Sequence, residues 1–160
     1  MILKLGWFVS LISILAAGCA VAWATHTKVI QNQSEEVRVI AQDAFSNKEW
    51  ELSKEKNLEI LSEDPEDPDG WFYLGLSQHY LGEFDAARRS FLNSKNFGHE
   101  PSIIHYNLAC GYALQGYDKG VFEQIQISKD LGFPVEAFAQ NDEDLREYIN
   151  RPEFKQIIGD

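Results

Sequence analysis

The sequence is poor in cysteine and in basic residues, and both shortages narrow the classes of protein that it could form. Two cysteines among 160 residues exclude a small domain held together by a disulfide framework. Lys and Arg number 14 against 25 Asp and Glu, which gives a formal net charge of −11. Nucleic-acid binding depends largely on Lys and Arg neutralising phosphates, so we expect no nucleic-acid partner.

Signatures of catalysis and of cofactor binding are also lacking. The chain has no glycine loop that would cradle phosphates, no nucleophile elbow and no histidine pair at helical spacing. The acidic stretch 63–70 would place Pro65 and Leu76 where a calcium loop needs carboxylates. Cys110 lies in an apolar stretch, where a cysteine is usually a small core residue. We therefore expect no enzyme activity, no cofactor and no metal site.

Apolar residues, by contrast, are plentiful, at 44% of the chain with 12% aromatic. This is enough for a packed core, and the length fits one domain behind a terminal segment. The most apolar stretch is residues 5–24, which carry no charge and would extend about 30 Å as a helix, the thickness of a hydrocarbon core. Trp7 and Trp23 lie near its ends, where indoles favour the membrane interface.

We therefore predict a single-pass transmembrane anchor within residues 1–24 and a polar tether over residues 25–33. Lys4 precedes the apolar run, so the remainder is expected on the extracytoplasmic side, which is the periplasm in a bacterium. Two alternatives stay open. The segment could be a cleaved signal, giving a secreted protein, or a lipoprotein signal, because Leu15 to Cys19 resembles a bacterial lipobox and would place a lipid on Cys19.

The body of the chain contains an internal repeat. Residues 68–101 align with residues 102–134 at an offset of 34 residues, and large side chains then meet large ones while small meet small. The clearest pairs are Leu74 with Leu108, Gly75 with Ala109, Gly82 with Gly116, Phe91 with Ile125, and Ser94 with Ser128. Each unit shows two stretches of helical periodicity with a glycine between them, where the left-handed conformation can end the first helix.

This pattern resembles the tetratricopeptide repeat (TPR) family. The middle unit carries the family's residues at the family's spacing: Trp71, Leu74, Gly75, Gly82, Ala87, Phe91 and Ser94. Gln78 departs from the pattern, and Tyr112 restores it in the next unit. A degenerate unit precedes them over residues 34–67, with Lys48 in place of the turn glycine and with Ser53 and Asn57 at packing positions. The resemblance implies an all-α fold, a short right-handed superhelix of about three helix pairs behind the N-terminal apolar helix.

Residues 135–160 are predicted to cap this array. They resemble the closing segment of bacterial TPR arrays, which is needed because stacked repeats expose an apolar face at each end. Apolar positions recur at helical spacing in two short stretches. We predict that both stretches pack on the helix over residues 122–129, through Leu145, Tyr148, Ile149, Phe154, Ile157 and Ile158.

The resemblance also implies a binding surface, because the first helix of each TPR lines a concave groove. The corresponding positions define the predicted peptide groove: Arg38, Gln42, Phe45, Phe72, Leu76, His79, Tyr80, Ile103, Tyr106, Cys110 and Leu114. The centre of the groove is apolar and its rim is acidic, which favours an extended peptide or a helix with basic flanks. The alternative is that the N-terminal helix or the tail folds across these residues and buries them.

The predicted function is therefore that of a membrane-tethered, extracytoplasmic adaptor or scaffold for a protein partner. Two other functions remain open at this point. A self-assembling structural protein would take a second copy of the chain as its partner. An enzyme-associated protein would use Cys110.

Overall fold

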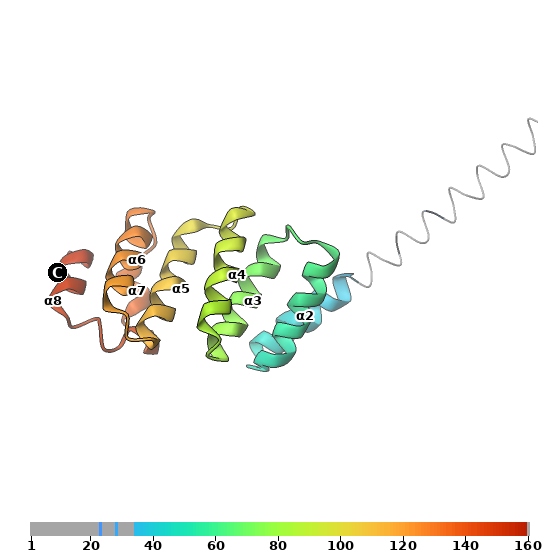
Figure 1. Cartoon of the computed structure of the whole chain (residues 1–160), viewed down its shortest axis with the longest axis horizontal. Coiled ribbons are helices and arrows are strands. Elements are labelled where there is room, and N and C mark those ends of the chain that lie inside the picture. Colours follow the sequence, from blue (N-terminus) through green and yellow to red (C-terminus); the bar gives the residue numbers. More distant parts are fainter. Residues whose placement is uncertain (1–22, 24–27, 29–33, 160) are drawn as a thin grey trace, which may run out of the picture. The chain divides into compact units, whose positions relative to one another are not determined.

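The computed structural model describes residues 23, 28 and 34–159, and the regular structure of these residues is entirely helical (Figure 1). The predicted all-α fold is thereby confirmed. The chain divides into two units, Met1–Val39 and Ile40–Asp160. Of the first unit, Trp23, Lys28 and residues 34–39 are described, and all of these are helical.

The predictions for the N-terminal segment fall almost wholly outside the described residues. This holds for the anchor over residues 1–24 except Trp23, for the tether except Lys28, and for lipidation at Cys19. In the part of the chain that is described, no helix combines the length and the apolar character needed to cross a membrane.

The second unit is a succession of helices joined by short turns. Residues 40–46 complete a first helical stretch, and the following helices are α2 (Trp50–Glu63), α3 (Pro68–Tyr80), α4 (Phe84–Asn96), α5 (Pro101–Leu114) and α6 (Asp118–Asp130). The tail contains α7 (Val135–Ala139), the 3-10 helix η1 (Glu143–Leu145) and α8 (Pro152–Ile158). Each helix from α2 to α6 packs against the next, and Figure 1 shows α3 to α6 side by side.

Helices α3 and α4 correspond to α5 and α6 at the offset found in the sequence. Ser94 in α4 donates a hydrogen bond from Oγ to the carbonyl oxygen of Pro68, at 2.8 Å. Ser128 in α6 donates the same bond to the carbonyl oxygen of Ser102, also at 2.8 Å. In both helix pairs, therefore, the end of the second helix is hydrogen-bonded to the first turn of the first helix.

The contact inside each pair joins a small residue to a large one. A β-carbon added at Gly75 would lie 2.7 Å from the ring of Phe91, which is closer than real side chains come. The glycine therefore allows α3 and α4 to approach. In the next pair the equivalent residues are Ala109 and Ile125, which are both fully buried.

Helix α2 packs on α3 through buried polar groups, at the packing positions where the degenerate unit carries Ser53 and Asn57. Ser53 and Asn57 are almost completely buried. Asn57 donates from Nδ2 to the carbonyl oxygen of Ser53 at 2.8 Å, and Ser53 Oγ lies 2.9 Å from Ser77 Oγ in α3. Because these groups have hydrogen-bond partners, their burial does not carry the full desolvation cost of an unpaired polar atom.

The tail packs on α6 as predicted. Leu145, Tyr148 and Phe154 are buried in one core cluster with Val121 and Ile125 of α6. The other predicted capping residues are partly buried against the same cluster: Ile149, Ile157 and Ile158. The tail therefore covers the face that α5 and α6 would otherwise expose at the end of the array.

In each of the three helix pairs, one residue with a left-handed backbone conformation follows the first helix. The φ angles of Lys48, Gly82 and Gly116 are 62°, 77° and 69°. The prediction of left-handed glycines at the two later turns is confirmed, and Lys48 adopts the same conformation with a side chain. A β-carbon makes this conformation unfavourable by about 1–2 kcal/mol, whereas glycine adopts it freely.

Lys48→Gly should therefore stabilise the fold. Relief of the steric cost exceeds the extra chain entropy that glycine brings to the unfolded state, so we expect a gain of about 0.5–1 kcal/mol. Urea unfolding of the full chain measures it. Lys48→Ala is the matched control, since it removes the same charge but keeps the β-carbon, and it should give no gain. Equal effects of the two substitutions would contradict a strained Lys48.

Candidate functional site

The predicted groove residues differ widely in accessibility. Those that are buried are Phe72, His79, Tyr106 and Cys110, and those that are partly buried are Arg38, Phe45, Leu76 and Ile103. Gln42, Tyr80 and Leu114 are exposed. Arg38 belongs to the first unit and the others to the second. In the second unit, a partner can therefore reach only part of the predicted set.

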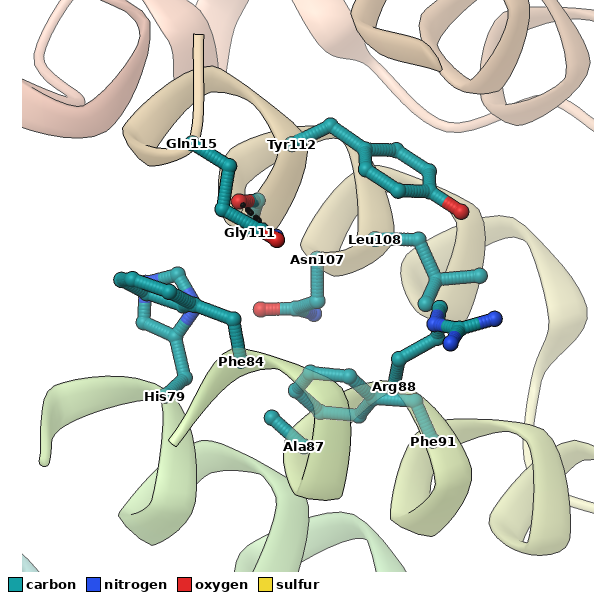
Figure 2. A pocket seen from close by; sticks show the side chains of 10 residues that line it. All are labelled: His79, Phe84, Ala87, Arg88, Phe91, Asn107, Leu108, Gly111, Tyr112 and Gln115. Carbon is teal, nitrogen blue, oxygen red and sulfur yellow. Dashed lines mark hydrogen bonds between the residues drawn. The ribbon is translucent and has the colours of Figure 1, made fainter. Parts of the chain in front are cut away.

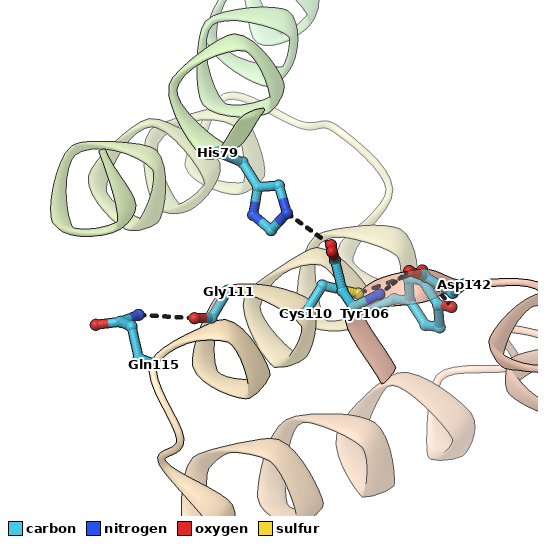
Figure 3. Close-up of polar contacts among 7 residues, drawn as sticks. His79, Tyr106, Cys110, Gly111, Gln115 and Asp142 are labelled. Carbon is cyan, nitrogen blue, oxygen red and sulfur yellow. Dashed lines mark hydrogen bonds and ion pairs between the residues drawn. The ribbon is translucent and has the colours of Figure 1, made fainter. Parts of the chain in front are cut away.

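Two acidic residues of the tail account for the buried part of the set. Tyr106 donates from its hydroxyl to Asp142 Oδ2 at 2.8 Å, and Cys110 Sγ lies 3.5 Å from the same oxygen (Figure 3). His79 Nε2 lies 2.7 Å from Asp144 Oδ2. The tail thus lies across α5 and reaches α3. This agrees with the alternative left open by the sequence, in which the tail buries part of the predicted groove.

The loop geometry holds the two carboxylates in place. Asp142 caps η1 by accepting the backbone N–H of Asp144 on Oδ1 at 3.0 Å. This leaves Asp142 Oδ2 directed at Tyr106 and Cys110. The sequence placed both acids in the capping segment and assigned them no part in the site. Their contacts span 32 to 65 residues, and no periodic pattern of the sequence signals them.

The two carboxylates create a negative potential around this cluster. Burial is the main cause of the raised pKa values of Tyr106 and Cys110, and Asp142 raises both further. At Tyr80 burial again raises the pKa most, followed by the charges of Asp144 and Asp142. Since Tyr80 is 54% exposed, the negative potential extends to the accessible surface.

Cys110, Asp142 and Asp144 also have the geometry of a small metal site. One ligand atom from each lies within 4.8 Å of the other two. The sequence interpretation expected no metal. In the structure both carboxylates already have partners, because Tyr106 donates to Asp142 and His79 contacts Asp144. The hydrogen bonds alone therefore explain the cluster as a polar contact between the tail and the helices.

A pocket lies between α3 and α4 on one side and α5 on the other (Figure 2). It is lined by His79, Phe84, Ala87, Arg88, Phe91, Asn107, Leu108, Gly111, Tyr112 and Gln115. Its volume of about 10 Å³ is the space of a single water molecule. Sites for small organic ligands usually measure about 300 Å³ or more. The pocket is therefore a packing gap between helices.

An aromatic cluster around the exposed Tyr80 joins two predicted groove residues to two that sequence reasoning missed, Trp50 and Tyr73. We define it as Phe45, Trp50, Tyr73 and Tyr80. Trp50 stacks on Tyr80 with ring centroids 4.2 Å apart, and Phe45 lies edge-on at 5.3 Å from both Trp50 and Tyr73. Trp50 was omitted because it starts α2, a second helix of a pair. Trp50 follows the turn at Lys48, and Tyr80 precedes the turn at Gly82. Because these two turns are equivalent in the repeat, the contact between Trp50 and Tyr80 could have been predicted.

Comparison with known proteins adds no assignment. The chain matches no model of a protein family and no curated protein. The function is therefore argued from the geometry of the described residues.

The environment of Cys110 predicts a slow reaction with alkylating reagents. The thiol is 3% exposed, and burial followed by the charge of Asp142 raises its pKa, so thiolate is scarce at neutral pH. In a Cys19→Ser variant of the full chain, iodoacetamide should modify native Cys110 at least about 100-fold more slowly than the same chain in urea. Mass spectrometry follows the reaction. Equal rates in the two conditions would contradict the burial and would favour an activated thiol.

Proposed function

We propose that this chain is a membrane-tethered, extracytoplasmic adaptor that binds a protein partner on a short array of TPR-like helix pairs. Support for the TPR assignment comes from the residues that match at the 34-residue offset, from the equivalent serine hydrogen bonds, and from the three left-handed turns. The tether rests on the uncharged apolar run at residues 5–24.

The observation that carries the binding proposal is the aromatic cluster around the exposed Tyr80. Tyr80 is 54% exposed although it stacks on Trp50, and the other three members of the cluster are partly buried, so one aromatic ring with partly accessible aromatic neighbours faces solvent. Tyr and Trp are enriched at the centres of protein interfaces, because they bury much area at a small entropy cost. Packed helices hold the cluster, so a partner would meet a surface that is already arranged.

The tail shifts the proposed contact away from α5. Tyr106 and Cys110 are covered, whereas Leu76 and Phe45 stay partly accessible and Tyr80 is exposed. We therefore propose that a peptide or helix contacts the part of the groove formed by residues 40–46 and α3. The proposed contact surface is therefore the predicted groove without the residues that the tail covers.

Self-assembly is the second candidate, and it has an observation of its own. Phe97 and Leu131 directly follow α4 and α6 and are 39% and 49% exposed. Apolar side chains exposed at equivalent positions of successive pairs could contact a second copy of the chain. An enzyme-associated role through Cys110 is disfavoured, because burial keeps the thiol protonated.

Cross-linked affinity capture from native membranes tests the adaptor proposal. The intact protein should recover a partner, and Tyr80→Ser should lose it while staying as helical as the wild type by circular dichroism. Tyr117→Ser is the matched control, since Tyr117 is similarly exposed at 51% but lies outside the cluster. Loss with both variants, or with neither, would refute binding at the cluster. Recovery of the chain itself as the main partner would favour self-assembly.

A further inference from the structure

The aromatic cluster has an acidic neighbour that makes one class of partner side chain more favourable than others. Asp144 reaches His79, whose ring meets the Tyr80 ring edge-on at a centroid distance of 5.5 Å. Asp142 lies two residues before Asp144, and the charges of both act on Tyr80. Carboxylates of the tail and an exposed aromatic surface of α3 therefore belong to one local environment.

The charges around this environment are predominantly negative. Besides the His79 imidazole, the titratable groups that meet there are all acids: Tyr80, Tyr106, Cys110, Asp142 and Asp144. Both lysines of α2 are already paired: Lys54 lies 2.7 Å from Glu83 and Lys56 lies 2.8 Å from Glu59. An apolar side chain docked here would dehydrate the carboxylates without compensation, whereas a cation would compensate their charge.

The same chain already holds an arginine in this combination of groups. In the tail, the Arg151 guanidinium lies 4.4 Å from the centroid of the Tyr148 ring. Arg151 Nη1 lies 2.7 Å from Asp118 Oδ2, and the Tyr148 hydroxyl donates to Asp118 Oδ1 at 2.8 Å. A tyrosine ring hydrogen-bonded to a carboxylate therefore binds a guanidinium in cis. At Tyr80 an aromatic ring again lies near a carboxylate, with the His79 ring between Tyr80 and Asp144.

We propose that the rings of Tyr80 and Trp50 bind an arginine side chain of the partner peptide, and that the nearby charges of Asp142 and Asp144, which keep their partners in the tail contact, favour its guanidinium. Guanidinium fits better than ammonium, because it is planar, stacks on aromatic rings and is more weakly hydrated. The inference rests on the proposed function, since it specifies the chemistry of the partner at the same surface. It adds Trp50 and the two aspartates to the residues that determine specificity.

A pair of synthetic peptides tests the inference on the full chain. The first is a peptide of two Gly-Leu-Arg repeats with fluorescein on its N-terminal amine and an amidated C-terminus, and the second replaces each arginine with citrulline, which keeps the shape and loses the charge. Fluorescence anisotropy at about 50 mM salt keeps electrostatic screening low. The arginine peptide should bind about tenfold more tightly than the citrulline peptide, as expected for a cation over aromatic rings beside a carboxylate.

Variants locate the contact. Tyr80→Ala should weaken the arginine peptide about tenfold, and Asp142→Asn and Asp144→Asn should each reduce the preference for arginine over citrulline. Tyr117→Ala and Glu136→Gln are the controls for an exposed aromatic and an exposed acid elsewhere, and neither should change the binding. Circular dichroism verifies that each variant is folded.

Each contrary result is decisive. Equal binding of the two peptides, with Tyr80→Ala weakening both, would overturn arginine recognition and leave the proposed peptide adaptor standing. Unchanged binding in Tyr80→Ala would overturn the location. Absence of binding to the wild-type chain at millimolar peptide would overturn the inference, while Tyr80-dependent capture from membranes would still support the adaptor.

Discussion

Close approach of two helices through a small residue facing a large one is the constraint on which this structure depends. Gly75 faces Phe91 with no space for a β-carbon, so α3 and α4 can pack only because the glycine has no side chain. The pair then needs a sharp turn, which the left-handed Gly82 provides. One face of α3 packs on α4 through Gly75, and Tyr80 at the end of α3 lies on the accessible surface.

The tail imposes the second constraint. A stack of helix pairs must cover its last apolar face, and Leu145 and Phe154 do so by packing with Val121 and Ile125. The loop that brings Leu145 to this position also carries Asp142 and Asp144 across α5. The same loop therefore completes the core and covers Tyr106 and Cys110, and the proposed contact lies on residues 40–46 and α3, which include most of the aromatic cluster.

Periodic features could be predicted from the sequence, and isolated polar contacts could not. Burial repeats along a helix, so Leu74, Leu108 and the capping residues were identifiable from spacing alone. The contact of His79 with Asp144 spans 65 residues and depends on the path of an irregular loop. Nothing local in either segment encodes it. The stacking of Trp50 on Tyr80 was missed for a related reason, since it crosses between helices that the groove assignment treated separately.

The central claim is that the tail lies across α5 and reaches α3, leaving the aromatic cluster as the open surface. A double-mutant cycle of His79→Ala and Asp144→Ala in the full chain tests it most directly, with free energies from urea unfolding. The account predicts a coupling energy of about 1–2 kcal/mol, because the His79 side chain is 6% exposed and the contact is 2.7 Å long. Effects of the single substitutions that add to within about 0.3 kcal/mol would contradict it.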